Sequence, residues 1–169
     1  MATTPPPAAG ESTAPDRPGR ADPPPRTRPA LLVVEDSLTH RRNLRDVLAP
    51  YYELLWAENA RDALALAFTR RPRLILLDVN IEPPPISELD KKGRSVRTRP
   101  VGGLEVCRQL KKSILRPTPV VILSAQKSYL ARIKGRVAHA NDYLTKPVED
   151  RLLLETIFKY LGHPRGADR

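Results

Sequence analysis

The chain has 169 residues, a hydrophobic fraction of 40% and a formal net charge of +10, and this length is enough for one domain with a buried core. Its single cysteine, Cys107, excludes an internal disulfide and is typical of a reducing compartment. No apolar stretch follows Met1 as in a secretory signal, and none is long enough to span a bilayer, so we expect a cytoplasmic protein without membrane insertion.

The positive charge is scattered in short pairs such as Arg41-Arg42 and Lys111-Lys112. No aromatic residues are interleaved with these pairs, and no helix-turn-helix or zinc motif accompanies them. A nucleic-acid-binding protein remains an alternative supported by charge alone, and it would show binding that depends steeply on salt. We expect no nucleic-acid partner.

The N-terminal segment differs in composition from the rest of the chain. Nine of the 19 prolines lie in residues 1–29, and this segment has no hydrophobic periodicity. A segment of this composition cannot bury enough apolar surface to offset the conformational entropy that it would lose on ordering. We therefore predict a disordered Pro-rich tail at 1–29, a folded domain at 30–161 and a short C-terminal tail at 162–169.

Strand and helix patterns alternate five times within the folded domain. Apolar runs predict strands, and apolar residues at helical spacing predict helices. The alternation predicts a three-layer (βα)5 α/β fold, a parallel sheet covered on both faces with the flavodoxin-like strand order 2-1-3-4-5. In chain order, the elements are a strand at 31–34, a helix after an N-cap at Ser37, a strand at 52–56, a helix after an N-cap at Asn59, a strand at 74–77, a helix at 103–110, a strand at 119–123, a helix at 126–138, a strand at 142–145 and a helix at 149–161.

Residues 81–101 interrupt this alternation. The segment is polar, charged and contains prolines, and it is longer than the usual loop of 2–6 residues between a strand and a helix. We expect a mobile inserted loop. A partner-docking or gating element is the alternative, because the segment begins next to Asn80 at the end of a strand.

Polar side chains end four of the five predicted strands: Glu35 and Asp36, then Asp78, Ser124 and Lys146. The carboxyl ends of parallel strands meet at one edge of a sheet, where ligands bind in open α/β folds. Three carboxylates there would repel one another unless a hard cation such as Mg²⁺ joined them. A lysine and a hydroxyl beside them would neutralise and bond a phosphoryl group, which the central Asp78 would accept as nucleophile.

Four blocks of the sequence resemble the response regulator receiver domains of the CheY-like family. The resemblance covers about residues 30–161 without the inserted loop. Two further stretches, at 36–39 and 134–138, are most similar to PilG-type single-domain regulators, which belong to chemotaxis-like systems that control type IV pili. The four blocks are Val33-Val34-Glu35-Asp36-Ser37, Leu76-Leu77-Asp78-Val79-Asn80, Val121-Ile122-Leu123-Ser124-Ala125 and Tyr143-Leu144-Thr145-Lys146-Pro147.

The resemblance implies a role for each residue at the acidic edge. Asp78 is the phosphoacceptor. Glu35 and Asp36 bind Mg²⁺ together with Asp78 and the main-chain carbonyl of Asn80.

Three further residues take their roles from the same resemblance. Lys146 and Ser124 contact the phosphoryl group. Tyr143 matches the switch aromatic that turns inward when Ser124 moves toward the phosphate, and the alternative is a half-buried aromatic residue of the sheet. Gln126 is either an ordinary helix-start residue or a group that tunes the lifetime of the phosphate.

The resemblance also implies what the protein does. We expect a single-domain response regulator of a two-component phosphorelay, phosphorylated by a sensor histidine kinase and catalysing only its own phosphorylation and dephosphorylation. Only eight residues follow Leu161, so we expect output by contact with a downstream protein. The expected surface is the face formed by the fourth helix, fifth strand and fifth helix.

Two alternatives remain open. A pseudo-receiver would bind partners without turning over phosphate. A small aspartate-nucleophile phosphatase would need a second Asp two residues after Asp78, where this chain has Asn80.

The chain departs from the family pattern at three places. Glu35 stands where Asp is commoner, His139-Ala140 replaces Gly-Ala, and the loop after Asp78 carries about 16 extra residues relative to short loops of this kind. We expect His40, His139 and His163 to be surface residues, since they lack metal-binding spacing, and Cys107 to fill the core.

Overall fold

The computed structural model describes residues 28–81, 88–89, 95–96 and 102–163, without the side chains of the two short segments and of 129–131. Nearly all of the expected Pro-rich tail, most of the expected loop at 81–101 and most of the expected C-terminal tail lie outside the described residues. The boundaries expected there therefore stay predictions.

The core of the protein is a parallel sheet of five strands in the order β2-β1-β3-β6-β7. This is the predicted 2-1-3-4-5 order, since β6 and β7 are the fourth and fifth strands of that sheet. Every residue of β3 and β6 is buried, as expected for strands covered on both faces. The bounds are β1 (Ala30–Val34), β2 (Glu53–Ala57), β3 (Leu74–Asp78), β6 (Val120–Ser124) and β7 (Asp142–Thr145).

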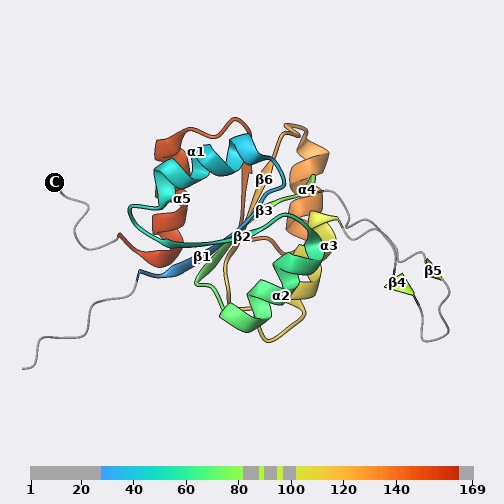
Figure 1. Cartoon of the computed structure of the whole chain (residues 1–169). Coiled ribbons are helices and arrows are strands. Elements are labelled where there is room, and N and C mark those ends of the chain that lie inside the picture. Colours follow the sequence, from blue (N-terminus) through green and yellow to red (C-terminus); the bar gives the residue numbers. More distant parts are fainter. Residues whose placement is uncertain (1–27, 82–87, 90–94, 97–101, 164–169) are drawn as a thin grey trace, which may run out of the picture.

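Five helices cover the two faces of the sheet, with α1 and α5 on one side and α2, α3 and α4 on the other (Figure 1). Alternate residues of β1 enter two separate apolar clusters, because successive strand side chains point to opposite faces. Leu32 and Val34 face one cluster, whereas Leu31 and Val33 face the other. The bounds are α1 (Leu38–Leu48), α2 (Ala60–Arg70), α3 (Gly103–Lys111), α4 (Tyr129–Val137) and α5 (Asp150–Leu161).

The predicted N-caps of the first two helices are confirmed. Ser37 Oγ accepts a hydrogen bond from the N–H of His40, and the Asn59 side chain accepts one from the N–H of Asp62. These caps decide where α1 and α2 begin, and the cap at Ser37 places the first turn of α1 directly after Glu35 and Asp36.

The fourth helix begins at Tyr129 rather than at 126. The backbone of Gln126 is engaged elsewhere: its N–H donates to Ser124 Oγ at 3.1 Å, and its carbonyl accepts from Tyr143 Oη at 2.8 Å. These two bonds hold Gln126 in the loop after β6, which explains why the helix starts later than the sequence predicted.

A two-stranded antiparallel sheet lies within the inserted segment, formed by β4 (Glu88–Leu89) and β5 (Ser95–Val96). The sequence did not predict it, because two residues per strand are too few for an alternating pattern to show. Among the described residues, no helix is both long enough and apolar enough to cross a membrane.

Candidate functional site

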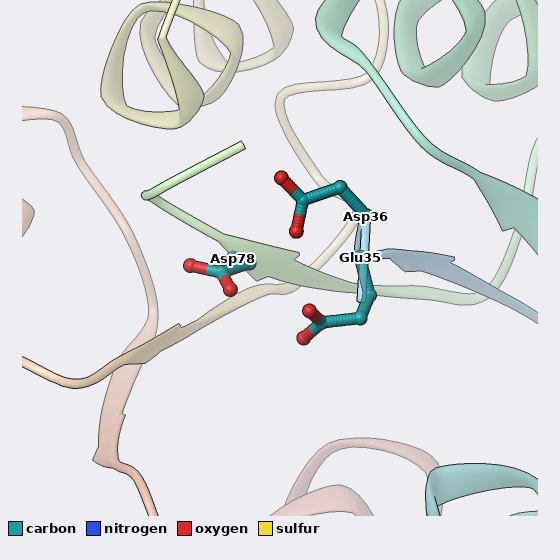
Figure 2. A group of neighbouring side chains, drawn as sticks. All are labelled: Glu35, Asp36 and Asp78. Atoms are coloured by element: carbon teal, nitrogen blue, oxygen red, sulfur yellow. The ribbon is translucent and has the colours of Figure 1, made fainter. Parts of the chain in front are cut away.

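Three carboxylates meet beyond the carboxyl ends of β1 and β3. Glu35 and Asp36 directly follow β1, and Asp78 is the last residue of β3. Their ligand oxygens all lie within 4.8 Å of one another, and Figure 2 shows the three side chains gathered at this edge of the sheet. Glu35 and Asp78 are buried, whereas Asp36 is exposed to solvent. The topology therefore brings together the acidic residues that the sequence predicts to share a site.

Lys146 follows β7 and bridges two of these carboxylates. Its Nζ donates to Asp78 Oδ2 at 2.6 Å and to Glu35 Oε2 at 2.5 Å. Burial lowers the pKa of Lys146, but its hydrogen bonds to the Asp78 and Glu35 carboxylates and the charges of these groups raise it above its ordinary value overall. Lys146 is therefore an ammonium at neutral pH and compensates two buried negative charges.

The second oxygen of Asp78 is held by the main chain. Asp78 Oδ1 accepts a 2.7 Å hydrogen bond from the N–H of Asn80, so both carboxylate oxygens have a donor. Asn80 itself is exposed, two residues beyond Asp78. The carboxylate is thus fixed in orientation at the rim of the site, with an exposed polar residue beside it.

Ser124 and Tyr143 are linked through the loop after β6. Ser124 is fully buried and its Oγ accepts from the N–H of Gln126, whose carbonyl accepts from the Tyr143 hydroxyl. The Tyr143 ring lies against α4 at Gly135, where a Cβ would stand 3.1 Å from Tyr143 Cδ2. A movement of Ser124 would therefore change the surroundings of Tyr143 through one shared residue, Gln126.

His40 is a site residue that sequence reasoning missed. Its side chain is 51% exposed, as expected of a surface histidine, but its Nδ1 lies 3.2 Å from Glu35 Oε1 and 3.3 Å from Lys146 Nζ. The spacing from Glu35 matches no metal motif. The available signal was the helix start at Leu38, which puts His40 in the first turn beside the strand end.

The donor set at this edge fits a hard divalent cation. All three acidic residues offer oxygen ligands, which Mg²⁺ prefers, and the exposed Asp36 leaves one side of the cluster accessible to water. Glu35 supplies a carboxylate where Asp is commoner in the family. Like Asp78, it is buried.

A hollow lies beside Tyr143. It has a volume of 360 Å³ and is lined by α4, β7 and α5, with Arg132, Arg136 and Lys159 supplying positive charge beside Tyr143. Lys159 is paired with Asp142 at 3.0 Å. The surface beside the predicted switch residue is therefore basic.

Comparison with known sequences gives a consistent set of relatives. A model of the response regulator receiver domain matches residues 97–158. Protein PilH of Pseudomonas aeruginosa is 31% identical over 129 residues, which is 75% of this chain and 93% of PilH. Response regulator MprA of Mycolicibacterium vanbaalenii is 36% identical over 69% of this chain, but the match spans 43% of MprA. The chain thus matches nearly the whole of PilH and less than half of MprA.

Solved structures show the same architecture. Chemotaxis protein CheY4 of Vibrio cholerae has a TM-score of 0.63 and 25% identity, covering 79% of this chain and 99% of CheY4. The receiver domain of sensor histidine kinase PA1611 from Pseudomonas aeruginosa has a TM-score of 0.65 at 21% identity, covering 81% of this chain and all of that domain. That domain has a magnesium ion coordinated in its active-site cleft.

Proposed function

The chain belongs to the response regulator receiver domain family, and from this we propose that it is a phosphorylation switch of a two-component system that accepts a phosphoryl group on Asp78. The observation that carries the proposal is the position of Asp78. Its carboxylate is buried among Glu35, Asp36 and the Lys146 ammonium, and both its oxygens are oriented by donors.

Glu35, Asp36 and Asp78 would hold Mg²⁺, with the main-chain carbonyl of Asn80 as a further ligand. The bound ion supplies positive charge that stabilises the oxygens of the transferring phosphoryl group. A magnesium ion in the cleft of a protein with the same fold supports this assignment, together with the oxygen-only donor set of this chain.

The phosphoryl donor in this proposal is the phosphohistidine of a sensor histidine kinase. A carboxylate oxygen of Asp78 attacks phosphorus as the bond from phosphorus to the imidazole nitrogen breaks, and the electron pair stays on that nitrogen. Lys146 already lies on Asp78 and would neutralise the phosphoryl oxygens, while the Ser124 hydroxyl would donate to one of them. The chain would catalyse only its own phosphorylation and dephosphorylation, in the cytoplasm.

Output would pass to a downstream protein through the face of α4, β7 and α5. Acyl phosphate formation would draw Ser124 toward the site and bias the position of Tyr143 through Gln126, which both residues contact. The Arg132, Arg136 and Lys159 side chains beside Tyr143 favour an acidic surface on the partner.

Intact mass spectrometry after incubation with acetyl phosphate and Mg²⁺ tests the proposal. We expect one phosphoryl adduct on the full chain, which does not form when EDTA is present during the incubation and does not form in Asp78→Asn. Asp46→Asn removes an exposed carboxylate from α1 and should leave the adduct unchanged. A folded wild-type chain that forms no adduct would instead indicate a pseudo-receiver, an interaction module that does not turn over phosphate.

A further inference from the structure

We propose that His40 is a positioning residue of the acidic site, which holds the Glu35 carboxylate so that Lys146 remains available to Asp78. The inference rests on the proposed function, because it concerns how the same site binds Mg²⁺ and accepts phosphate. It goes beyond that function by assigning a role to a residue outside the predicted set of ligands and phosphoryl contacts.

Glu35 has a longer side chain than the Asp that is commoner at this place. Glu carries one methylene more than Asp, so its carboxylate reaches farther from the end of β1 and has one more rotatable bond to fix. The Glu35 side chain is only 1% exposed, so its oxygens depend mainly on protein donors for their hydrogen bonds. A buried carboxylate that lacks donors is costly, and protein groups must therefore hold both its oxygens.

The donors around Glu35 divide between its two oxygens. Lys146 Nζ donates to Oε2 at 2.5 Å. On the other oxygen, the N–H of Ser37 donates to Oε1 at 3.2 Å, and His40 Nδ1 lies at the same distance from that atom. His40 is thus the second side chain, after Lys146, to contact this carboxylate among the described residues.

The orientation of His40 is set by the start of α1. Its N–H is capped by Ser37 Oγ, which fixes the backbone of the first turn directly beside Glu35. A ring nitrogen either donates or accepts, so an Nδ1–H that donates to Glu35 does not accept from Lys146, 3.3 Å away. All three Lys146 protons then remain for the carboxylates and for an incoming phosphoryl group.

This division of donors matters most when Asp78 carries a phosphoryl group. Lys146 must then serve the phosphoryl oxygens, and Glu35 loses part of its strongest partner. The imidazole of His40, together with the N–H of Ser37, keeps donors on Oε1. Glu35 therefore stays oriented toward the metal position.

Isothermal titration of the full chain with MgCl₂, paired with the rate of adduct formation from acetyl phosphate, tests this role. His40→Met removes the donor at similar size, and we expect Mg²⁺ binding to weaken about tenfold, with slower phosphorylation, as is common for groups that orient metal ligands. His40→Gln keeps a side-chain N–H and should restore most of the affinity. His163→Met replaces an imidazole that packs on Phe158 at the end of α5 and should change neither measurement.

A double-mutant comparison separates positioning from a general effect of charge or surface. Glu35→Asp shortens the carboxylate and withdraws it from His40, so His40→Met should cost less affinity in that background than in the wild type. Equal losses in both backgrounds, a loss of less than twofold for His40→Met, or no rescue by His40→Gln would overturn the inference. A wild-type chain that neither binds Mg²⁺ nor forms an adduct would overturn the proposed function as well. That result is seen in the wild type, whereas the outcomes that overturn only the role of His40 are seen in the variants.

Discussion

A Cβ placed on Gly103 would stand 2.4 Å from the carbonyl oxygen of Asp78. The first residue of α3 therefore packs directly on the last residue of β3, and no side chain fits between them. Gly103 lies two residues beyond the inserted segment at 81–101, and Ile81 at the start of that segment is only 3% exposed. The chain is thus anchored on both sides of the segment, by Ile81 in the apolar core and by Gly103 against Asp78.

Replacing Gly103 with Ala should disturb the site through its backbone. The added methyl would press on Asp78 and on Val79 Cα, 2.6 Å away, so one of the two main chains must shift. We expect a loss of about 1–3 kcal/mol in the free energy of unfolding and a slower acetyl phosphate reaction. Urea denaturation and intact mass measure the two effects.

The neighbouring glycine provides the control for this prediction. A Cβ on Gly102 would have no atom within 4 Å, so Gly102→Ala should cost only the loss of about 1 kcal/mol or less that Ala causes at an N-cap, without slowing the acetyl phosphate reaction. Equal losses for the two substitutions would show that helix-start propensity, rather than contact with Asp78, controls this position.

The grouping of residues at strand ends could be predicted from the sequence, because a parallel sheet places the carboxyl ends of all its strands at one edge. Once the alternation predicts the order 2-1-3-4-5, Glu35, Asp78 and Lys146 must meet at one edge. Contacts that depend on side-chain direction or on close backbone approach could not be predicted in this way. The contact of His40 with Glu35 and the close approach of Gly103 to Asp78 both depend on the exact start of a helix, which sequence patterns locate only to within a few residues.

Shortening the inserted segment should leave phosphorylation intact. Removing about 16 residues between 82 and 101 would restore a loop of ordinary length, and the anchors at Ile81 and Gly103 would remain. We expect the rate of adduct formation and the Mg²⁺ affinity to stay within twofold of wild type. A large change in rate or in phosphate lifetime would instead assign a gating role to the segment.

Removing the Lys146 ammonium should destabilise the protein as well as inactivate it. Lys146→Met leaves the buried Glu35 and Asp78 carboxylates without their shared cation, and such losses cost about 3 kcal/mol or more. We expect a lower urea midpoint at neutral pH and no acetyl phosphate adduct. Lys127→Met changes an exposed lysine and should behave as wild type; an unchanged midpoint for Lys146→Met would show that the carboxylates are solvated or neutralised in another way.

His139 lies in the left-handed region, with φ of 62°, in the turn between α4 and β7. Members of the family commonly have Gly at this position. The observed φ gives the physical reason, because Gly adopts a positive φ without a steric cost. His139→Gly should raise the free energy of unfolding by about 0.5–1 kcal/mol, because relief of backbone strain outweighs the added entropy of the unfolded chain. His139→Ala keeps the Cβ and should give no such gain in the same urea titration.

The Cys107 thiol should make stability fall at alkaline pH. It is fully buried and donates to the carbonyl of Ala138 at 3.2 Å, and burial raises its pKa to about 11 from 9.0. Between these values the unfolded thiol ionises while the folded one stays protonated, so rising pH favours the unfolded chain. Cys107→Ala removes this effect, and the advantage of wild type over the variant should shrink by about 1 kcal/mol between pH 8 and pH 10. Tyr52, whose pKa burial raises to about 12, is present in both proteins and cancels in the difference. A constant difference across this range would mean that the thiol ionises equally in the folded and unfolded states.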